Sequence, residues 1–287
     1  MKRNKTNSET SPGSPKKIAL INDFSGFGRC SLTVEIPVIS YLGVQCCCLP
    51  TAILSNHTGF DTYFFDDYTD KMPKYIDKWK ELSLSFDGIL TGFLGSERQI
   101  KTVSRFISDF KKENTTVIVD PVMGDHGKTY DTYTPQMCER MRELVGLAHI
   151  ICPNLTEACI LTKTPYKHSG WKKSELFKIA RALENMGAEK IVITGIETKQ
   201  SIGNLVHIRG GEPKIFYSRK TGKTRSGSGD VFSSIIAADA LCGVDFEASV
   251  KRAADFLKKC IAVSEAACVP DEEGVAFEVV LSELKKY

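Results

Sequence analysis

The sequence predicts an α/β fold in which a central, mostly parallel sheet has helices on both faces. Two observations predict it. Short apolar runs bounded by Gly, Pro or Asn alternate along the chain with amphipathic stretches at helical spacing. The chain also has 287 residues, 42% of them hydrophobic, which is enough for one large core. Such alternation is typical of parallel strands joined by crossover helices.

The expected strands are the apolar runs at residues 16–22, 44–54, 87–93, 116–122, 149–154 and 190–195. A helix is expected from about 30 to 42, with Pro37 inside it. Apolar residues recur three and four apart over 100–110 and over 176–186, which predicts two amphipathic helices. Gly187 would end the second of these.

The last third of the chain differs in pattern. Residues 204–220 resemble a hairpin, a small flap inserted before two final helical stretches at about 246–267 and 277–286. The sequence has no internal repeat, and no Pro/Gly linker divides it, so residues 17–287 are expected to form a single domain. The polar residues 1–16 are expected to be a disordered tail.

Composition excludes several classes of protein. The formal charge is +3, and residues 1–17 hold five basic residues and one acid, so the body is almost neutral and no nucleic-acid partner is expected. No apolar run approaches the roughly 18 residues that span a bilayer, so no membrane partner is expected. The ten cysteines form no CxxC pair, which indicates free thiols and a cytoplasmic location.

The segment Arg225–Phe232 carries the sharpest chemical signal, RSGSGDVF before an apolar helix. Gly227, Ser228 and Gly229 would turn backbone N–H groups toward one point at a helix start, which suits a phosphate. Asp230 would repel phosphate, so it is better placed to face an incoming hydroxyl and accept its proton. The alternative is a Ser/Asp helix cap in a Gly-rich turn.

A second signal follows two neighbouring strands. Asp120 and Asp125 follow one strand, and Asn154 and Glu157 follow the next. Carboxylates at adjacent strand ends can hold a hydrated Mg²⁺ that bridges to phosphates, so Asp120 and Glu157 are the candidate metal ligands. The alternative is that Asn154 and Glu157 only cap a helix and that Asp120 only orders a turn.

The third signal is local charge. Residues 213–229 contain five basic residues, among them Lys220 and Lys223, and no acid. A basic segment before an anion cradle is typical of a mobile flap that neutralises phosphates and excludes water. The alternative is a solvated hairpin.

Together these motifs resemble the ribokinase-like superfamily, and within it the pyridoxal kinase family. The segment GSGD at 227–230 is similar to the superfamily signature. The segments VDPVMGD (119–125), PNLTE (153–157), SNHTGF (55–60) and LTGFLGS (90–96) are similar to motifs of the pyridoxal kinases. The resemblance covers roughly residues 17–268.

The resemblance implies transfer of the ATP γ-phosphoryl group to the 5′-hydroxymethyl of pyridoxal, pyridoxine or pyridoxamine, with Mg²⁺ and with a monovalent cation such as K⁺ as a further candidate. Asp230 would be the catalytic base, beside an anion hole of Gly227, Ser228 and Gly229. The residues implied on the ATP side are Asp120, Asp125, Asn154, Glu157, Thr194, Lys220 and Lys223. Those implied around the vitamin are Asp23, Ala52, Leu54, His57, Thr58 and Phe93. A homodimer is also implied.

Departures from the family pattern leave the acceptor open. Phe60 and Phe93 stand where Tyr is frequent, and the opening Asp23-Phe24-Ser25-Gly26 is more similar to hydroxymethylpyrimidine kinases of thiamine biosynthesis. A hydroxymethylpyrimidine kinase is therefore one alternative. A protein that binds a vitamer or nucleotide without catalysis is another. For His57, the alternative is a loop histidine bonded to the backbone.

Overall fold

The computed structural model describes residues 15–284, so most of the predicted tail lies outside the described residues. The strands are β1 (Lys17–Phe27), β2 (Gln45–Asn56), β3 (Phe65–Asp67), β4 (Gly88–Thr91), β5 (Thr116–Val119), β6 (Gly124–Asp125), β7 (Lys128–Thr129), β8 (Ile150–Ile151), β9 (Lys190–Glu197), β10 (Ser201–Ile208) and β11 (Lys214–Arg219). Nine of them form one sheet in the order β11-β10-β9-β8-β5-β4-β1-β2-β3, and β6 pairs with β7 in a separate ribbon.

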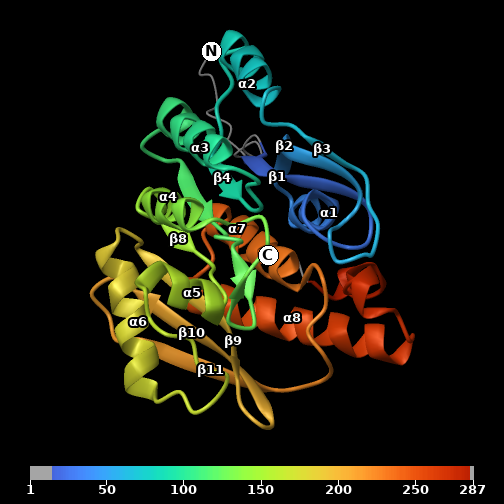
Figure 1. Cartoon of the computed structure of the whole chain (residues 1–287), viewed down its shortest axis with the longest axis vertical. Coiled ribbons are helices and arrows are strands. Elements are labelled where there is room, and N and C mark those ends of the chain that lie inside the picture. Colours follow the sequence, from blue (N-terminus) through green and yellow to red (C-terminus); the bar gives the residue numbers. More distant parts are fainter. Residues whose placement is uncertain (1–14, 285–287) are drawn as a thin grey trace, which may run out of the picture.

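The helices are α1 (Leu32–Tyr41), α2 (Met72–Glu81), α3 (Glu97–Phe110), α4 (Pro135–Val145), α5 (Leu155–Thr162), α6 (Lys173–Asn185), α7 (Ser228–Leu241) and α8 (Phe246–Ala266). Two 3₁₀ helices follow, η1 (Asp271–Glu273) and η2 (Phe277–Glu283). Figure 1 shows the sheet running through the molecule between these helices. The predicted α/β architecture is confirmed.

Alternate residues of each strand face two different helical layers, as the pleat of a strand requires. In β1, Ile18 and Leu20 pack with α1, α7 and α8, whereas Ala19 and Ile21 pack with the layer of α2 to α6. The inner strands are therefore apolar on both sides, which is why they read as continuous apolar runs. They pair in parallel from β2 through β1, β4, β5 and β8 to β9.

Several elements differ from the sequence prediction. The elements that were not predicted are β3, β6, β7, α2, α4 and α5, and strands β5 and β8 are shorter than expected. Strand β1 runs five residues beyond the predicted end at 22, because Phe24, Ser25 and Phe27 keep pairing with β2 after a shift of register. The predicted hairpin 204–220 corresponds to β10 and β11, which extend the main sheet by antiparallel pairing, with β11 at the edge. The last predicted helix is a 3₁₀ helix whose buried side chains, Phe277 and Val280, lie three residues apart.

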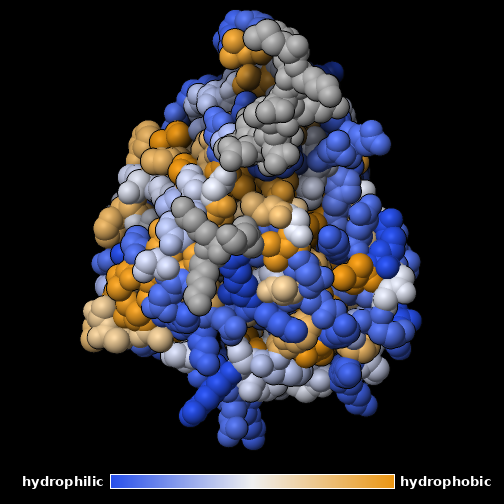
Figure 2. Space-filling model, turned by 180° about the vertical axis from the view of Figure 1, so that it is seen from behind, coloured by the Kyte–Doolittle hydropathy of each residue, from blue (hydrophilic) through white to orange (hydrophobic). Residues whose placement is uncertain are grey.

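The helices, the surface and the thiols can be compared with the composition. Within residues 15–284, no helix is long and apolar enough to cross a membrane. On the face in Figure 2, hydrophobic side chains lie among hydrophilic ones. All ten cysteines are free, as predicted.

Candidate active site

The carboxyl ends of the parallel strands bring the predicted motifs together. Hydrogen bonding between neighbours continues past the strands: Gly92 N donates to Ile21 O at 2.9 Å, and Asp120 N donates to Thr91 O at 3.0 Å. Segments that follow different strands therefore lie next to each other at one edge of the sheet. This edge is where open α/β sheets bind ligands.

The Gly-rich loop begins α7 without a side-chain cap. Gly227 is the N-terminal residue of the turn, with a left-handed φ of 75°, and no described side chain caps the helix. A Cβ on Gly227 would lie 2.2 Å from the Arg29 carbonyl oxygen, so only glycine fits. The Ser228 hydroxyl donates to Arg225 O at 2.8 Å. Ser228 N donates to Arg225 O at 3.3 Å, so an anion cradle would depend mainly on the N–H groups of Gly227 and Gly229 and on the helix dipole. The lack of a side-chain cap favours the anion cradle over the helix-cap alternative.

Asp230 lies in the first turn of α7 and is half-buried. Burial raises the pKa of its carboxyl to about 6, and the nearby charge of Asp23 acts in the same direction. Hydrogen bonds from the Ser31 backbone and the Asn22 side chain oppose this rise. A carboxylate with such a pKa is ionised at neutral pH and is a better proton acceptor than an exposed aspartate.

Asp120 and Glu157 are buried neighbouring acids, and Asp120 also lies near Asp230. Burial raises the pKa of Asp120 to about 7, and the charge of Asp230 adds to the rise. The pKa of Glu157 is also raised well above its ordinary value, by burial and then by the charge of Asp120. Its two oxygens accept backbone N–H groups, from Met123 at 3.1 Å and from Asn154 at 2.8 Å.

Asn154 and Glu157 form a capping box at the start of α5. The Asn154 side chain accepts from Glu157 N at 2.9 Å and donates to Gly124 O at 2.8 Å. Thr194, which is half-buried in β9, forms an isolated bridge with Asn154. Asp125 in the β6–β7 ribbon accepts from His126 N at 2.7 Å. The helix cap by Asn154 and Glu157, expected as the alternative to a metal site, is therefore present. It holds both residues at the carboxyl ends of the strands.

Asp23 lies where β1 shifts its register against β2, between Asn22 and Phe24. It is buried, and its two oxygens accept from Ser25 Oγ at 2.9 Å and Ser31 Oγ at 2.5 Å. Burial raises the pKa of its carboxyl, while the two serines lower it.

The other residues predicted around the vitamin occupy β2 and the loops beside it. Ala52 and Leu54 are buried in β2, Phe93 is half-buried after β4, and Thr58 is exposed. His57 Nδ1 accepts from Gly59 N at 3.1 Å, and Nε2 lies 2.6 Å from Glu272 O. Both ring nitrogens of His57 thus contact backbone groups, as the alternative of a loop histidine bonded to the backbone expects. Its ring also packs on Phe60, with centroids 4.8 Å apart.

The basic segment before α7 is paired with acids that are distant in sequence. Lys220 Nζ lies 2.6 Å from Glu197, and Lys223 Nζ lies 3.5 Å from Asp271. Both lysines are at the surface. The local excess of charge in the sequence is therefore offset in the fold by neighbouring carboxylates.

Two residues at this edge were missed by the sequence reasoning. Asn22 and Glu35 are each only 1% exposed, and Asn22 Nδ2 donates to Glu35 Oε1 at 2.9 Å. Asn22 Nδ2 also lies 3.5 Å from Asp230 Oδ1. An acid in the apolar run LTVEIPVIS was the available signal for Glu35.

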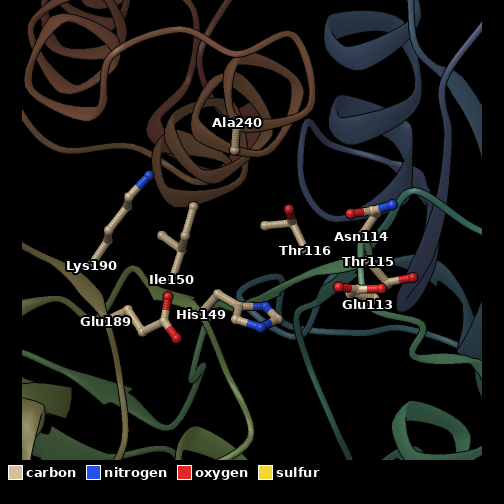
Figure 3. Close-up of a pocket in the computed structure, with 9 residues that line it drawn as sticks. All are labelled: Glu113, Asn114, Thr115, Thr116, His149, Ile150, Glu189, Lys190 and Ala240. Carbon is tan, nitrogen blue, oxygen red and sulfur yellow. The ribbon is translucent and has the colours of Figure 1, made fainter.

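A hollow of about 370 Å³ lies at the opposite edge of the sheet, where strands β5, β8 and β9 begin (Figure 3). It is lined by Thr116, His149 and Lys190 among others, and by none of the predicted site residues. The hollow is therefore separate from the predicted site.

Comparison with known proteins agrees with this geometry. The family model described as phosphomethylpyrimidine kinase matches residues 34–273. A Caenorhabditis elegans protein named "Putative pyridoxal kinase" is 30% identical over 179 residues, which cover 58% of this chain and only 53% of that protein.

Two crystal structures are similar over almost the whole chain. One, from Bacteroides thetaiotaomicron, is described as a "putative phosphomethylpyrimidine kinase" in a form with pyridoxal. It is 38% identical, has a TM-score of 0.91, and the match covers 94% of this chain and 96% of that one. The pyridoxal kinase of Lactobacillus plantarum is 27% identical with a TM-score of 0.87, over 94% and 97% of the two chains. The chain therefore belongs to the phosphomethylpyrimidine and pyridoxal kinase family of ribokinase-like proteins.

Proposed function

We propose that this protein transfers the γ-phosphoryl group of ATP to the 5′-hydroxymethyl of a B6 vitamer, as a pyridoxal kinase of pyridoxal 5′-phosphate salvage. The observation that carries the proposal is the placement of Asp230. Its carboxylate lies in the first turn of a helix whose N-terminal N–H groups no described side chain caps. Proton acceptor and phosphate cradle thus meet at one point.

Asp230 acts as the base that orients the acceptor hydroxyl and takes its proton as the phosphoryl group moves. The N–H groups of Gly227, Ser228 and Gly229 stabilise the negative charge that spreads over the phosphoryl oxygens. The protein forms no covalent bond in this scheme, because phosphoryl transfer depends mainly on positioning and electrostatics.

The acid cluster fits a hydrated Mg²⁺. Burial raises the pKa of both Asp120 and Glu157; the charge of Asp230 adds to the rise at Asp120, and the charge of Asp120 adds to the rise at Glu157. A cation nearby would relieve this unfavourable charge. Within residues 15–284, no group of three or more acids, histidines or cysteines is arranged to enclose a metal ion. Mg²⁺ needs no such group, because it keeps several waters and binds one or two carboxylates together with phosphates. Asp120 would hold it directly, and Glu157 through water.

The ATP side would extend from these acids along the sheet edge. The phosphates would be lined by Asp125 in the β6–β7 ribbon, by Asn154 at the start of α5 and by its bridge partner Thr194. Lys220 and Lys223 would approach the phosphates by exchanging Glu197 and Asp271 for a stronger anion. This exchange would turn the segment before α7 into the predicted flap.

The vitamin would lie between β1, β2 and the loop after β4, against Asp23, Ala52, Leu54, His57, Thr58 and Phe93. Support comes from the Bacteroides thetaiotaomicron protein, whose described crystal form contains pyridoxal. The paired serines hold Asp23 in one orientation, which suits a hydrogen bond to a polar ring substituent.

A hydroxymethylpyrimidine kinase is the second candidate. The matching family model is described as phosphomethylpyrimidine kinase, which also names a pyrimidine as acceptor, and the opening Asp23-Phe24-Ser25-Gly26 favours this candidate. A protein that binds without catalysis is less consistent with a site that retains Asp230, Asp120 and Glu157.

A coupled ADP-release assay across pyridoxal, pyridoxamine, pyridoxine and the aminopyrimidine tests the proposal. We expect the highest kcat/KM for a B6 vitamer, and a higher value for the pyrimidine would replace the assignment. Asp230→Asn should bind both substrates while kcat falls by roughly 10²–10⁴-fold, since the base is lost. ATP binding without ADP release for every acceptor would favour the non-catalytic alternative.

The single domain over residues 17–287, the homodimer, the cytoplasmic location and the need for K⁺ stay predictions. Limited proteolysis, light scattering, cell fractionation and activity with and without K⁺ would test them in that order.

A further inference from the structure

Asn22 has one fixed orientation in the structure. Its side-chain oxygen accepts two backbone N–H groups, from Asp23 at 3.0 Å and from Phe93 at 2.8 Å. The amide nitrogen must therefore point the other way, where it donates to Glu35 and reaches toward Asp230. Both N–H groups of the side chain are directed at carboxyl oxygens.

The loop after β4 is shaped around this amide. A Cβ on Gly92 would lie 2.3 Å from Asn22 Nδ2, so any larger residue at 92 would displace the amide. Residue 92 in the LTGF segment must therefore be glycine because of Asn22, and contact with a substrate is not needed to explain it.

Glu35 is a buried acid that the proposed chemistry does not use. It lies in the first turn of α1, and its Oε2 atom has no hydrogen-bond partner among the described residues. Its pKa is raised well above the ordinary value, by burial first and then by the charge of Asp230. A buried acid without a counter-charge is costly, so its retention needs a role that offsets the cost.

We propose that Glu35 and Asn22 are positioning residues that hold the carboxylate of Asp230 in line with the acceptor hydroxyl. Glu35 Oε1 fixes one N–H of the Asn22 amide, and the second N–H then restrains Asp230 Oδ1. This inference rests on the proposed function, because it assigns the two residues to the base of that reaction. Neither residue touches substrate in this scheme, so their loss should lower kcat and leave KM almost unchanged.

The test compares Glu35→Gln with Glu35→Leu in the full chain. Gln keeps an acceptor oxygen for Asn22 and resembles the neutral acid, so kcat should stay within about twofold of wild type. Leu removes the acceptor, and kcat should fall roughly 10- to 100-fold, the loss typical of a misplaced catalytic group. KM for ATP and for the acceptor should change by less than about threefold in both variants.

Asp239 supplies the matched control. It is also a fully buried acid, in α7, and it pairs with Arg252 at 2.9 Å. Asp239→Leu should lower the thermal midpoint and leave kcat near wild type, with Asp239→Asn as a milder variant if Leu does not fold. Equal loss of kcat in Glu35→Leu and the Asp239 variant would assign both effects to stability and overturn the proposal.

A double-mutant cycle tests whether Asn22 acts through Asp230. Asn22→Ala should lower kcat at least tenfold in the wild-type background and by less than about twofold in the Asp230→Asn background. Equal effects in both backgrounds would overturn the proposal, as would wild-type kcat in Asn22→Ala. If Asp230→Asn lost activity while Glu35→Leu and Asn22→Ala kept the kcat of wild type, the positioning roles would be rejected but the proposed function would stand. An inactive wild-type protein would reject the proposed function itself.

Discussion

The guanidinium of Arg225 lies 3.2 Å from Asp271, so the residue that begins the Gly-rich loop is bound to η1. Arg225 also contacts Glu265 in α8 at 3.1 Å, and its side chain is only 4% exposed. Lys223 and His57 reach the same short segment, through Asp271 and the Glu272 carbonyl. The Gly-rich loop before α7 and the loop that carries His57 therefore share one support.

Arg225→Met should destabilise the protein by about 2 kcal/mol, because it removes the charged hydrogen bonds of a buried guanidinium to the half-exposed acids Glu265 and Asp271. It should also lower kcat/KM for ATP, since the loop before α7 loses its anchor. Urea unfolding and steady-state kinetics measure the two effects. Arg98→Met is the control: Arg98 pairs with Asp70 at 2.7 Å on the open surface, so the change should cost at most about 1 kcal/mol. Equal costs for the two variants would contradict the anchoring role.

Gly227→Ala should abolish most activity. It should also destabilise the fold by more than the cost of a left-handed alanine, because of a steric clash. The added Cβ meets the Arg29 carbonyl oxygen, which belongs to the backbone and cannot rotate away. Gly243 is a close match, with φ of 77°, and a Cβ added there would have no heavy atom within 4 Å. Gly243→Ala should therefore cost only about 1–2 kcal/mol, the strain of a left-handed alanine, and keep kcat. Similar unfolding curves for the two variants would argue against the close approach.

Asp120→Asn should stabilise the metal-free protein at pH 7.5 more than at pH 4.5. The pKa of Asp120 is raised to about 7 in the folded state, so the folded protein binds the proton more tightly than the unfolded chain. Wild-type stability that this group contributes is thus lost as the pH rises from about 4 to 7. Thermal midpoints with EDTA at both pH values measure the difference, with the exposed Asp61→Asn as control. If the thermal midpoints of Asp120→Asn and wild type differed equally at both pH values, the raised pKa of Asp120 would be wrong.

The grouping of the main candidate residues could be predicted from the sequence because their signals are local. The spacing of Gly227, Gly229 and Asp230 before an apolar helix is a property of neighbouring residues, and Asp120 directly follows a strand. Parallel strands end at a common edge, so separate motifs could be expected to meet there.

The contacts between distant segments could not be predicted in this way. Asn22 and Asp230 are 208 residues apart, and their approach depends on the packing of α1 and α7 over the sheet. The partners of Lys220 and Lys223 lie 23 and 48 residues away, so counting charge along one segment missed them. The longer β1 depends on a register shift that no local pattern shows.

The two outer strands of the sheet, β3 and β11, bear on aggregation by sheet extension. A free edge offers unpaired N–H and C=O groups to a second chain. Here β3 is only three residues long, with two aspartates, and β11 has Lys214 and Arg219 at its ends. Short length and charge both discourage pairing at an edge, so aggregation by sheet extension is disfavoured. A dimer, where it forms, would join through other surfaces than these strands.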